Sequence, residues 1–140
     1  MEDLQHEHSG LALEAPEALQ IAVGRGEDWW RVRLAGAAVV YERGRGQRVL
    51  ERAKAAPRAR EWQRFWGTVD RLKLWTWADR FEGAGDEDRW RLELSRGKRR
   101  IKSSGRAAFP PLASKSASPE FLILCGAISK PAGTVPLPFP

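Results

Sequence analysis

The chain has 140 residues, enough for one domain with a sizeable core, and seven of them are tryptophan. A single cysteine excludes a disulfide framework and a multi-cysteine zinc site. The net charge of +6 is uneven, because residues 1–28 sum to −6 and the remaining residues sum to +12. This asymmetry predicts either a basic body that meets an anionic partner or, alternatively, arginine accumulation from a GC-rich genome without a ligand.

Short sequence features bear on the cellular location of the protein and on whether it binds a metal or cofactor. The longest apolar run, residues 121–128, is too short to cross a bilayer, and the acidic residues 1–4 do not resemble a signal peptide. We therefore expect a cytoplasmic protein without membrane association. His6 and His8 are too few to fix a metal ion, and residues 86–88 lack the ligand spacing of a calcium loop. We expect no metal and no cofactor.

The first half of the chain predicts an antiparallel meander. Residues 1–17 show no usable period and are predicted to form a loosely ordered acidic arm. Apolar and polar residues alternate over 19–23 and 30–34, and β-branched and aromatic residues fill 37–41, so three strands are predicted there. Their connections are too short for parallel crossovers. Residues 47–56 remain open between a strand extension and the start of a helix.

The second half changes from a helical to a strand period near Leu72. Residues 57–72 predict a helix whose inward face includes Trp62, Phe65 and Trp66. Residues 74–78, 89–96 and 98–104 predict three further strands, the last two joined in a hairpin at Gly97, with a loop over 81–88. We expect Trp66 and Trp90 to be buried and to share a contact or a neighbour.

The closing segment predicts a fixed loop and a second helix. Ser103, Ser104 and Gly105 are expected to leave the last strand, with Gly105 at a positive φ and Phe109 as an apolar anchor. Ser118 and Pro119 have the residue types of an N-cap and a first helical position. In that helix Cys125 lies among apolar residues and is predicted to belong to the core.

Together these elements predict an α+β domain over residues 18–130. Its sheet is antiparallel, with about six strands and both helices on one face, in the order β-β-β-α-β-β-β-α. Residues 131–140 are rich in proline and glycine and predict a tail with polyproline character.

Several aromatic motifs resemble a group of small bacterial proteins of unknown function. The residues that support this similarity are Trp62-x-x-Phe65-Trp66, Trp75-x-Trp77, Trp90-x-Leu92-Glu93, Ile101-Lys102-Ser103-Ser104-Gly105 and Phe109-Pro110. The similarity covers about half the chain and implies the fold, but no activity is known for the group. Related sequences carry asparagine in the turn where this chain has Ala107.

A protein-interaction module is the first functional hypothesis. Trp29 and Trp30 are adjacent on a strand, so one ring faces the core and the other faces outward. An exposed Trp29 beside Arg31 and Arg33 has the composition of a binding hot spot. The alternative is that Trp29 packs under the N-terminal arm.

Nucleic-acid binding is the second hypothesis. The densest basic run consists of Arg96, Lys98, Arg99, Arg100, Lys102 and Arg106. Arg100, Lys102 and Ser104 would share one face of a strand, where cationic and hydroxyl groups can hold phosphate. Arg106 and Lys102 beside the predicted loop form the best single contact site. Against this, the sequence shows no exposed aromatic platform on which bases could stack, and a solvated sheet face also explains the run.

An enzyme is the least favoured hypothesis. Four carboxylates lie near one another in the sequence, at Asp79, Glu82, Asp86 and Glu93, and Ser103 and Ser104 supply hydroxyl groups. No nucleophile, base and orienting group can be assembled from their spacing, so we assign no catalytic residue. The expected partner is therefore another protein, with nucleic acid as the alternative.

Overall fold

A computed structural model describes residues 15–85 and 88–130, which form seven strands, two α-helices and one short 3-10 helix. The predicted tail and most of the predicted arm lie outside these residues, as do His6, His8 and Asp86. The strands are β1 (Ala18–Arg25), β2 (Asp28–Ala35), β3 (Ala38–Arg45), β4 (Arg48–Ala55), β5 (Arg80–Glu82), β6 (Asp88–Arg96) and β7 (Arg99–Arg106). The helices are α2 (Ala59–Arg71), η1 (Leu74–Thr76) and α3 (Pro119–Ser129).

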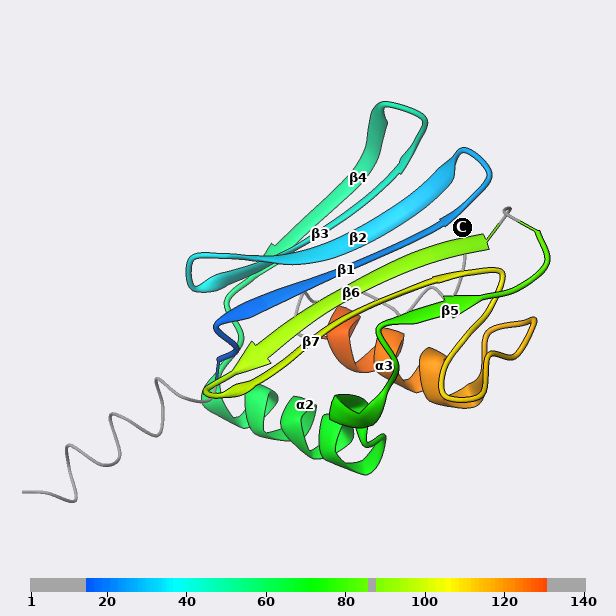
Figure 1. The fold of residues 1–140 in the computed structure, drawn as a ribbon. Coiled ribbons are helices and arrows are strands. Elements are labelled where there is room, and N and C mark those ends of the chain that lie inside the picture. Colours follow the sequence, from blue (N-terminus) through cyan, green and yellow to red (C-terminus); the bar gives the residue numbers. More distant parts are fainter. Residues whose placement is uncertain (1–14, 86–87, 131–140) are drawn as a thin grey trace, which may run out of the picture.

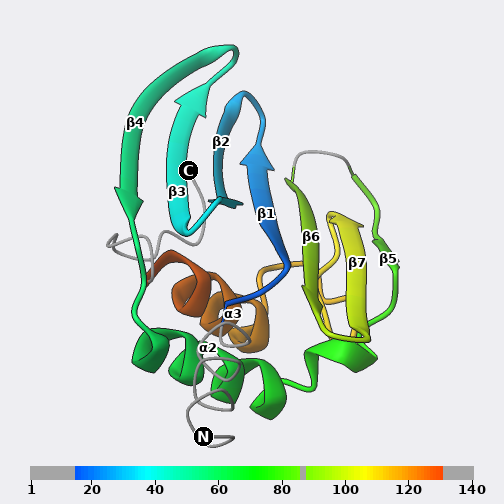
Figure 2. The same ribbon diagram turned by 90° about the vertical axis from the view of Figure 1, so that its left-hand side faces the viewer.

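All seven strands belong to one sheet in the order β4-β3-β2-β1-β6-β7-β5. The pairings are antiparallel except for β5, which lies parallel to β7 at the edge. Both α-helices lie on the same side of the sheet, as Figures 1 and 2 show. The α+β class and the placement of both helices on one face are therefore as predicted, whereas the strand count and order are not.

The additional strand is β4, in the segment that the sequence left open. Gly46 takes a positive φ of 58° in a tight turn, and β4 then pairs with β3 at the edge of the sheet. Six of its eight residues are exposed, so the strand carries no alternation of buried and exposed positions. An edge strand with solvent on both faces gives no periodic signal, which explains why the pattern could not assign it.

The predicted strand over 74–78 is wrong. This segment forms η1, preceded by Lys73 at a positive φ of 52°. The turn buries Leu74 and Trp77 and stacks the ring of Trp75 on Trp66 at 6.3 Å between centroids. The apolar residues of segment 74–78 therefore belong to a tight turn that packs against the core, and not to a strand. The short strand β5, Arg80–Glu82, begins one residue before the predicted loop over 81–88 and extends into it.

The aromatic core joins the helices to the sheet. Trp66 and Trp90 are 3% and 2% exposed, which confirms their predicted burial, and both belong to one hydrophobic core. Trp90 packs against Phe81 and Phe121, with ring centroids 5.9 and 5.1 Å away.

The predicted turn at residues 103–105 is also wrong, because β7 continues to Arg106. Gly105 faces the core, and a Cβ at this position would collide with the indole nitrogen of Trp90. That nitrogen donates a hydrogen bond to the carbonyl oxygen of Ala108 at 2.9 Å. Gly105 is thus required for close packing, while Ala107 is the residue with a positive φ, of 51°.

Between β7 and α3, and within α3, the structure agrees with the predicted roles of Phe109, Ser118 and Cys125. Phe109 is fully buried and packs on Phe121, with ring centroids 5.0 Å apart. Ser118 is the N-cap of α3, since its hydroxyl oxygen accepts a hydrogen bond from the backbone N–H of Phe121 at 3.1 Å. Cys125 is buried in this helix, and burial raises the pKa of its thiol, which confirms its assignment to the core.

Candidate functional site

One face of the sheet is free of helices and carries most of its charge. We call it the helix-free face, and its members follow from strand alternation and cross-strand register. Its basic residues are Arg31, Arg33, Arg52, Lys54, Arg80, Arg89, Arg91, Arg100, Lys102 and Arg106, and its acidic residues are Glu42, Glu82 and Glu93. Ten basic against three acidic residues make this face strongly basic.

The register brings together two surfaces that the sequence treated separately. One row across the sheet runs Trp29–Gly24–Arg89–Arg106, the next runs Arg31–Ala22–Arg91–Ser104, and a third runs Arg33–Gln20–Glu93–Lys102. Arg100 lies on the same face, opposite Ser95. All seven predicted contact residues therefore share the helix-free face. Arg96 does not, because its guanidinium stacks over the Trp66 ring at 4.6 Å from the centroid.

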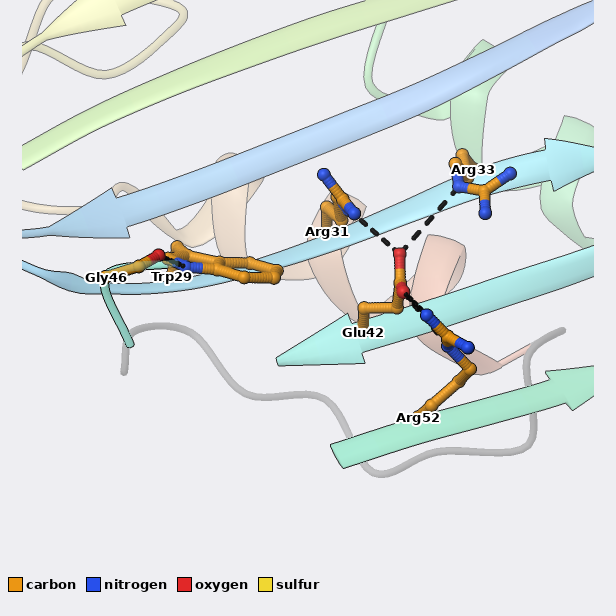
Figure 3. Close-up of polar contacts among 6 residues, drawn as sticks. All are labelled: Trp29, Arg31, Arg33, Glu42, Gly46 and Arg52. Atoms are coloured by element: carbon orange, nitrogen blue, oxygen red, sulfur yellow. Dashed lines mark hydrogen bonds and ion pairs between the residues drawn. The ribbon is translucent and has the colours of Figure 1, made fainter. Parts of the chain in front are cut away.

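Three arginines converge on one carboxylate in the β2–β4 part of this face. Glu42 on β3 accepts hydrogen bonds from Arg31 Nε and Arg52 Nε, each at 2.9 Å, and Arg33 Nε lies 3.8 Å from the same carboxylate (Figure 3). Glu42 is only 1% exposed, whereas the three arginine side chains are 42–63% exposed. We call these four residues the Glu42 cluster.

The electrostatics of the cluster follow from what covers the carboxylate. The hydrogen bond from Arg52 lowers the pKa of Glu42 most, burial raises it, and Arg31 lowers it further, so the net direction is downward. Because the arginines themselves form the cover, stabilisation of the charged form exceeds the cost of desolvation. Sequence analysis missed Glu42, since its burial depends on cations from two other strands and only the register reveals it.

Trp29 packs on the sheet instead of projecting from it. Its indole nitrogen donates a hydrogen bond to the carbonyl oxygen of Gly46 at 2.8 Å, and its ring covers Gly44, where a Cβ would collide with it. The guanidinium of Arg31 lies 5.1 Å from the ring centroid. Trp29 lies on the outward face, as predicted, but one side of its ring is used by the β3–β4 hairpin.

A second group of cations lies on β6 and β7 and forms no ion pair with the described acidic residues. We call Arg89, Arg91, Arg100, Lys102 and Arg106 the β6–β7 basic set. All five are exposed, and none forms an ion pair within the described ranges 15–85 and 88–130. The Arg89 guanidinium lies across Gly24, whose missing side chain leaves room for it.

Two hollows flank Arg91. One, of about 360 Å³, is floored by Ala22 and Gly24 and walled by Trp29, Arg31 and Arg89. The other, of about 270 Å³, is lined by side chains that include Asp79, Glu93, Lys102 and Ser104. Both are shallow depressions in a sheet surface, and they place cationic groups on either side of small residues.

The second hollow also bears on the enzyme hypothesis. It brings Asp79 and Glu93 near Ser103 and Ser104. The Ser103 hydroxyl already donates to the carbonyl oxygen of Ala78 at 2.6 Å, and no histidine lies in the described part of the chain. The geometry supplies a mixed-charge surface and no activated nucleophile.

Other site classes leave no trace in the described residues. Within ranges 15–85 and 88–130, no group of three or more histidine, cysteine or acidic side chains is arranged to hold a metal ion. No helix there has both the length and the hydropathy needed to span a membrane. Comparison of the chain with protein-family models and with curated proteins finds no match.

Proposed function

We propose that this protein binds single-stranded nucleic acid through its phosphates, on the helix-free face of the sheet. The observation that carries the proposal is the β6–β7 basic set, five exposed cations on two neighbouring strands with no ion pair among the described residues. Unpaired surface cations attract a polyanion because its binding releases condensed counter-ions.

The spacing of these cations suits an extended chain of phosphates. Neighbouring strands lie about 4.8 Å apart, and alternate residues along a strand are about 6.7 Å apart. Lys102, Ser104 and Arg106 follow one another at this interval on β7, with Arg91 opposite Ser104. A flexible single strand can adjust its phosphates to such a row, whereas a rigid duplex presents them in two fixed ridges.

The geometry supports backbone contacts more than base recognition. Trp29 is the one aromatic side chain that the described strands place on this face, and it covers Gly44. A row of stacked bases needs several aromatic platforms. We therefore propose binding with little sequence preference. The packing of Trp29 also weakens the alternative of a protein interface centred on this ring, because an interface anchor must be free to enter a pocket on its partner.

The proposal is tested by fluorescence anisotropy with a labelled oligo(dT) at a series of salt concentrations. Five phosphate contacts predict a log–log slope of about −3.5, which is a loss of roughly 100-fold in affinity between 50 and 200 mM salt. The variant Arg91→Ala/Lys102→Ala/Arg106→Ala should reduce the slope by about 2.

A charge-matched control lies on the opposite side of the molecule. Arg60→Ala/Arg64→Ala/Arg71→Ala removes the same charge from exposed positions of α2 and should leave the slope within about 0.5 of the wild type. Equal losses in both variants would indicate attraction by net charge alone and contradict a site on the sheet. Absence of binding at 20 mM salt would end the proposal, and stronger binding of a duplex would refute the preference for single strands.

A further inference from the structure

A second surface, on the helical side, lacks the polar cover that a solvent-facing helix normally has. The outward face of α3 carries Leu122, Ile123, Gly126 and Ala127, and no charged residue lies between Glu120 in the first turn and Lys130. Leu122 and Ile123 are 38% and 53% exposed. The outward face of α2 is polar by contrast. A helix that is apolar all round normally has a neighbour on each side, and no element within residues 15–85 and 88–130 covers this side of α3.

Part of this surface lines a groove between the two helices. The groove has a volume of about 1,260 Å³, and Ile123, Ala127 and Phe65 contribute apolar surface to it. Gly67 faces it from α2, with open space where a side chain would be. The helices that bound it have 13 and 11 residues, so its length of about 16–20 Å suits three turns of a third helix.

The rim of the groove is strongly basic. Arg58, Arg60, Arg64, Arg71 and Lys130 line it, and none of them forms an ion pair within the described residues. Glu61 is the one acidic lining residue, and its carboxylate accepts a hydrogen bond from the backbone N–H of Arg58 at 3.2 Å. An apolar floor with cationic edges is complementary to a segment with apolar residues on one face and carboxylates on the other.

We propose that the α2–α3 groove binds an acidic amphipathic helix of a partner protein. Apolar side chains of the partner pack on Ile123 and Ala127, and its carboxylates pair with Arg60, Arg64 and Arg71. This surface is separate from the helix-free face, so the proposal does not depend on nucleic-acid binding.

The test uses the full chain and a fluorescein-labelled helical peptide of about 15 residues, with leucines on one face and glutamates on the other. Ile123→Asp should weaken binding at least tenfold by placing a carboxylate on the apolar wall. Leu122→Asp is the matched control, since Leu122 is exposed on the same helix but does not line the groove. It should change affinity less than twofold. Both positions are solvent-exposed, so each variant should fold, and thermal unfolding monitored by circular dichroism tests this.

Further variants and a control peptide distinguish the proposed partner helix from other possible occupants of the groove. Arg60→Ala/Arg64→Ala/Arg71→Ala should weaken the peptide at least tenfold, while Arg91→Ala/Lys102→Ala/Arg106→Ala should leave it unchanged. A peptide with lysine in place of glutamate should not bind. The proposal is overturned by absence of saturable binding, by equal effects of Ile123→Asp and Leu122→Asp, or by displacement of the peptide by oligo(dT). A dimer in sedimentation that Ile123→Asp dissociates would also overturn it, by assigning the groove to a second copy.

Discussion

The two halves of the helix-free face use the same residue type for different purposes. In the β2–β4 half, Arg31, Arg33 and Arg52 surround Glu42, which is 1% exposed. In the β6–β7 half, Arg89, Arg91 and Lys102 point outward from the same sheet and form no ion pair among the described residues. One half neutralises much of its own charge and the other leaves it available.

The difference shows why the number of arginines is a poor guide to function. A carboxylate held by hydrogen bonds from two guanidinium groups contributes to the stability of the sheet, and its cations are less available to an external anion. Unpaired cations on an exposed strand contribute little to stability but set the affinity for a polyanion. The following variants test this division, beginning with the largest expected effect.

Gly105→Ala should destabilise the β6–β7 half by about 3 kcal/mol, since a new methyl group collides with Trp90 and disturbs its hydrogen bond to Ala108. Gly24→Ala is the matched control on the helix-free face, where the three atoms nearest to a Cβ belong to the end of the flexible Arg89 side chain, at 3.0–3.3 Å. It should cost less than about 0.5 kcal/mol. Urea unfolding measures both, and equal costs would contradict the assignment of Gly105 to close packing.

Glu42→Gln should leave the arginines of the β2–β4 half without an ion pair, as the cations of the β6–β7 half already are. Losing the charged hydrogen bonds should cost about 1–2 kcal/mol of unfolding free energy, reduced by the partial exposure of the three arginines. The freed guanidinium groups should also increase the salt slope of oligonucleotide binding by about 1. If both the stability and the salt slope were unchanged, Glu42 would not neutralise the charge of the three surrounding arginines.

Lowering the pH should progressively remove the contribution of the Glu42 cluster to the free energy of unfolding. The pKa of Glu42 is lowered in the folded protein relative to its ordinary value of 4.5, so the cluster stabilises the fold fully above that pH. The contribution is lost as the pH falls from 4.5 through the folded pKa. The difference in unfolding free energy between wild type and Glu42→Gln should therefore shrink between pH 5 and pH 3. A constant difference across this range would argue against the lowered pKa.

Arg52→Ala and Arg91→Ala should separate stability from binding. Arg52→Ala should cost up to about 1 kcal/mol, because it removes hydrogen bonds to Glu42, and should leave oligonucleotide affinity nearly unchanged. Arg91→Ala should keep stability within about 0.5 kcal/mol and reduce the salt slope by about 0.7. Chemical denaturation measures the stability of both variants, and anisotropy measures their binding. The proposed separation of roles is wrong if Arg52→Ala weakens binding and Arg91→Ala lowers stability.

Ala107→Gly provides the smallest effect and a control for stability alone. Ala107 follows the basic strand β7 at a positive φ of 51°, a conformation that glycine takes without steric cost. The substitution should stabilise the fold by about 0.5 kcal/mol, after the greater entropy of glycine in the unfolded chain is subtracted. Oligonucleotide affinity should stay the same, because no charge changes; altered affinity would implicate the turn itself in binding.

Local patterns predicted most of the architecture. Alternation in residues 19–23 and 30–34, the aromatic stripe that begins at Trp62, and the Ser118–Pro119 helix start all correspond to observed elements. These features depend on neighbours within a few residues, which a sequence displays directly. Six of the seven candidate contact residues were expected on outward strand positions and Arg106 in a loop, and all seven lie on the helix-free face.

Interactions between distant segments decided the rest. The strand β4 had no periodic signal at the sheet edge, and the apolar spacing of residues 74–78 belonged to a turn packed on Trp66. The burial of Glu42 requires arginines from β2 and β4, so no property of its own segment could reveal it. Thus the sequence by itself determined the fold class, the main helices and the outward cations, because these follow from short-range periodicity. Only the tertiary structure decided which cations are neutralised and which are free, because charge pairing across a sheet is set by register.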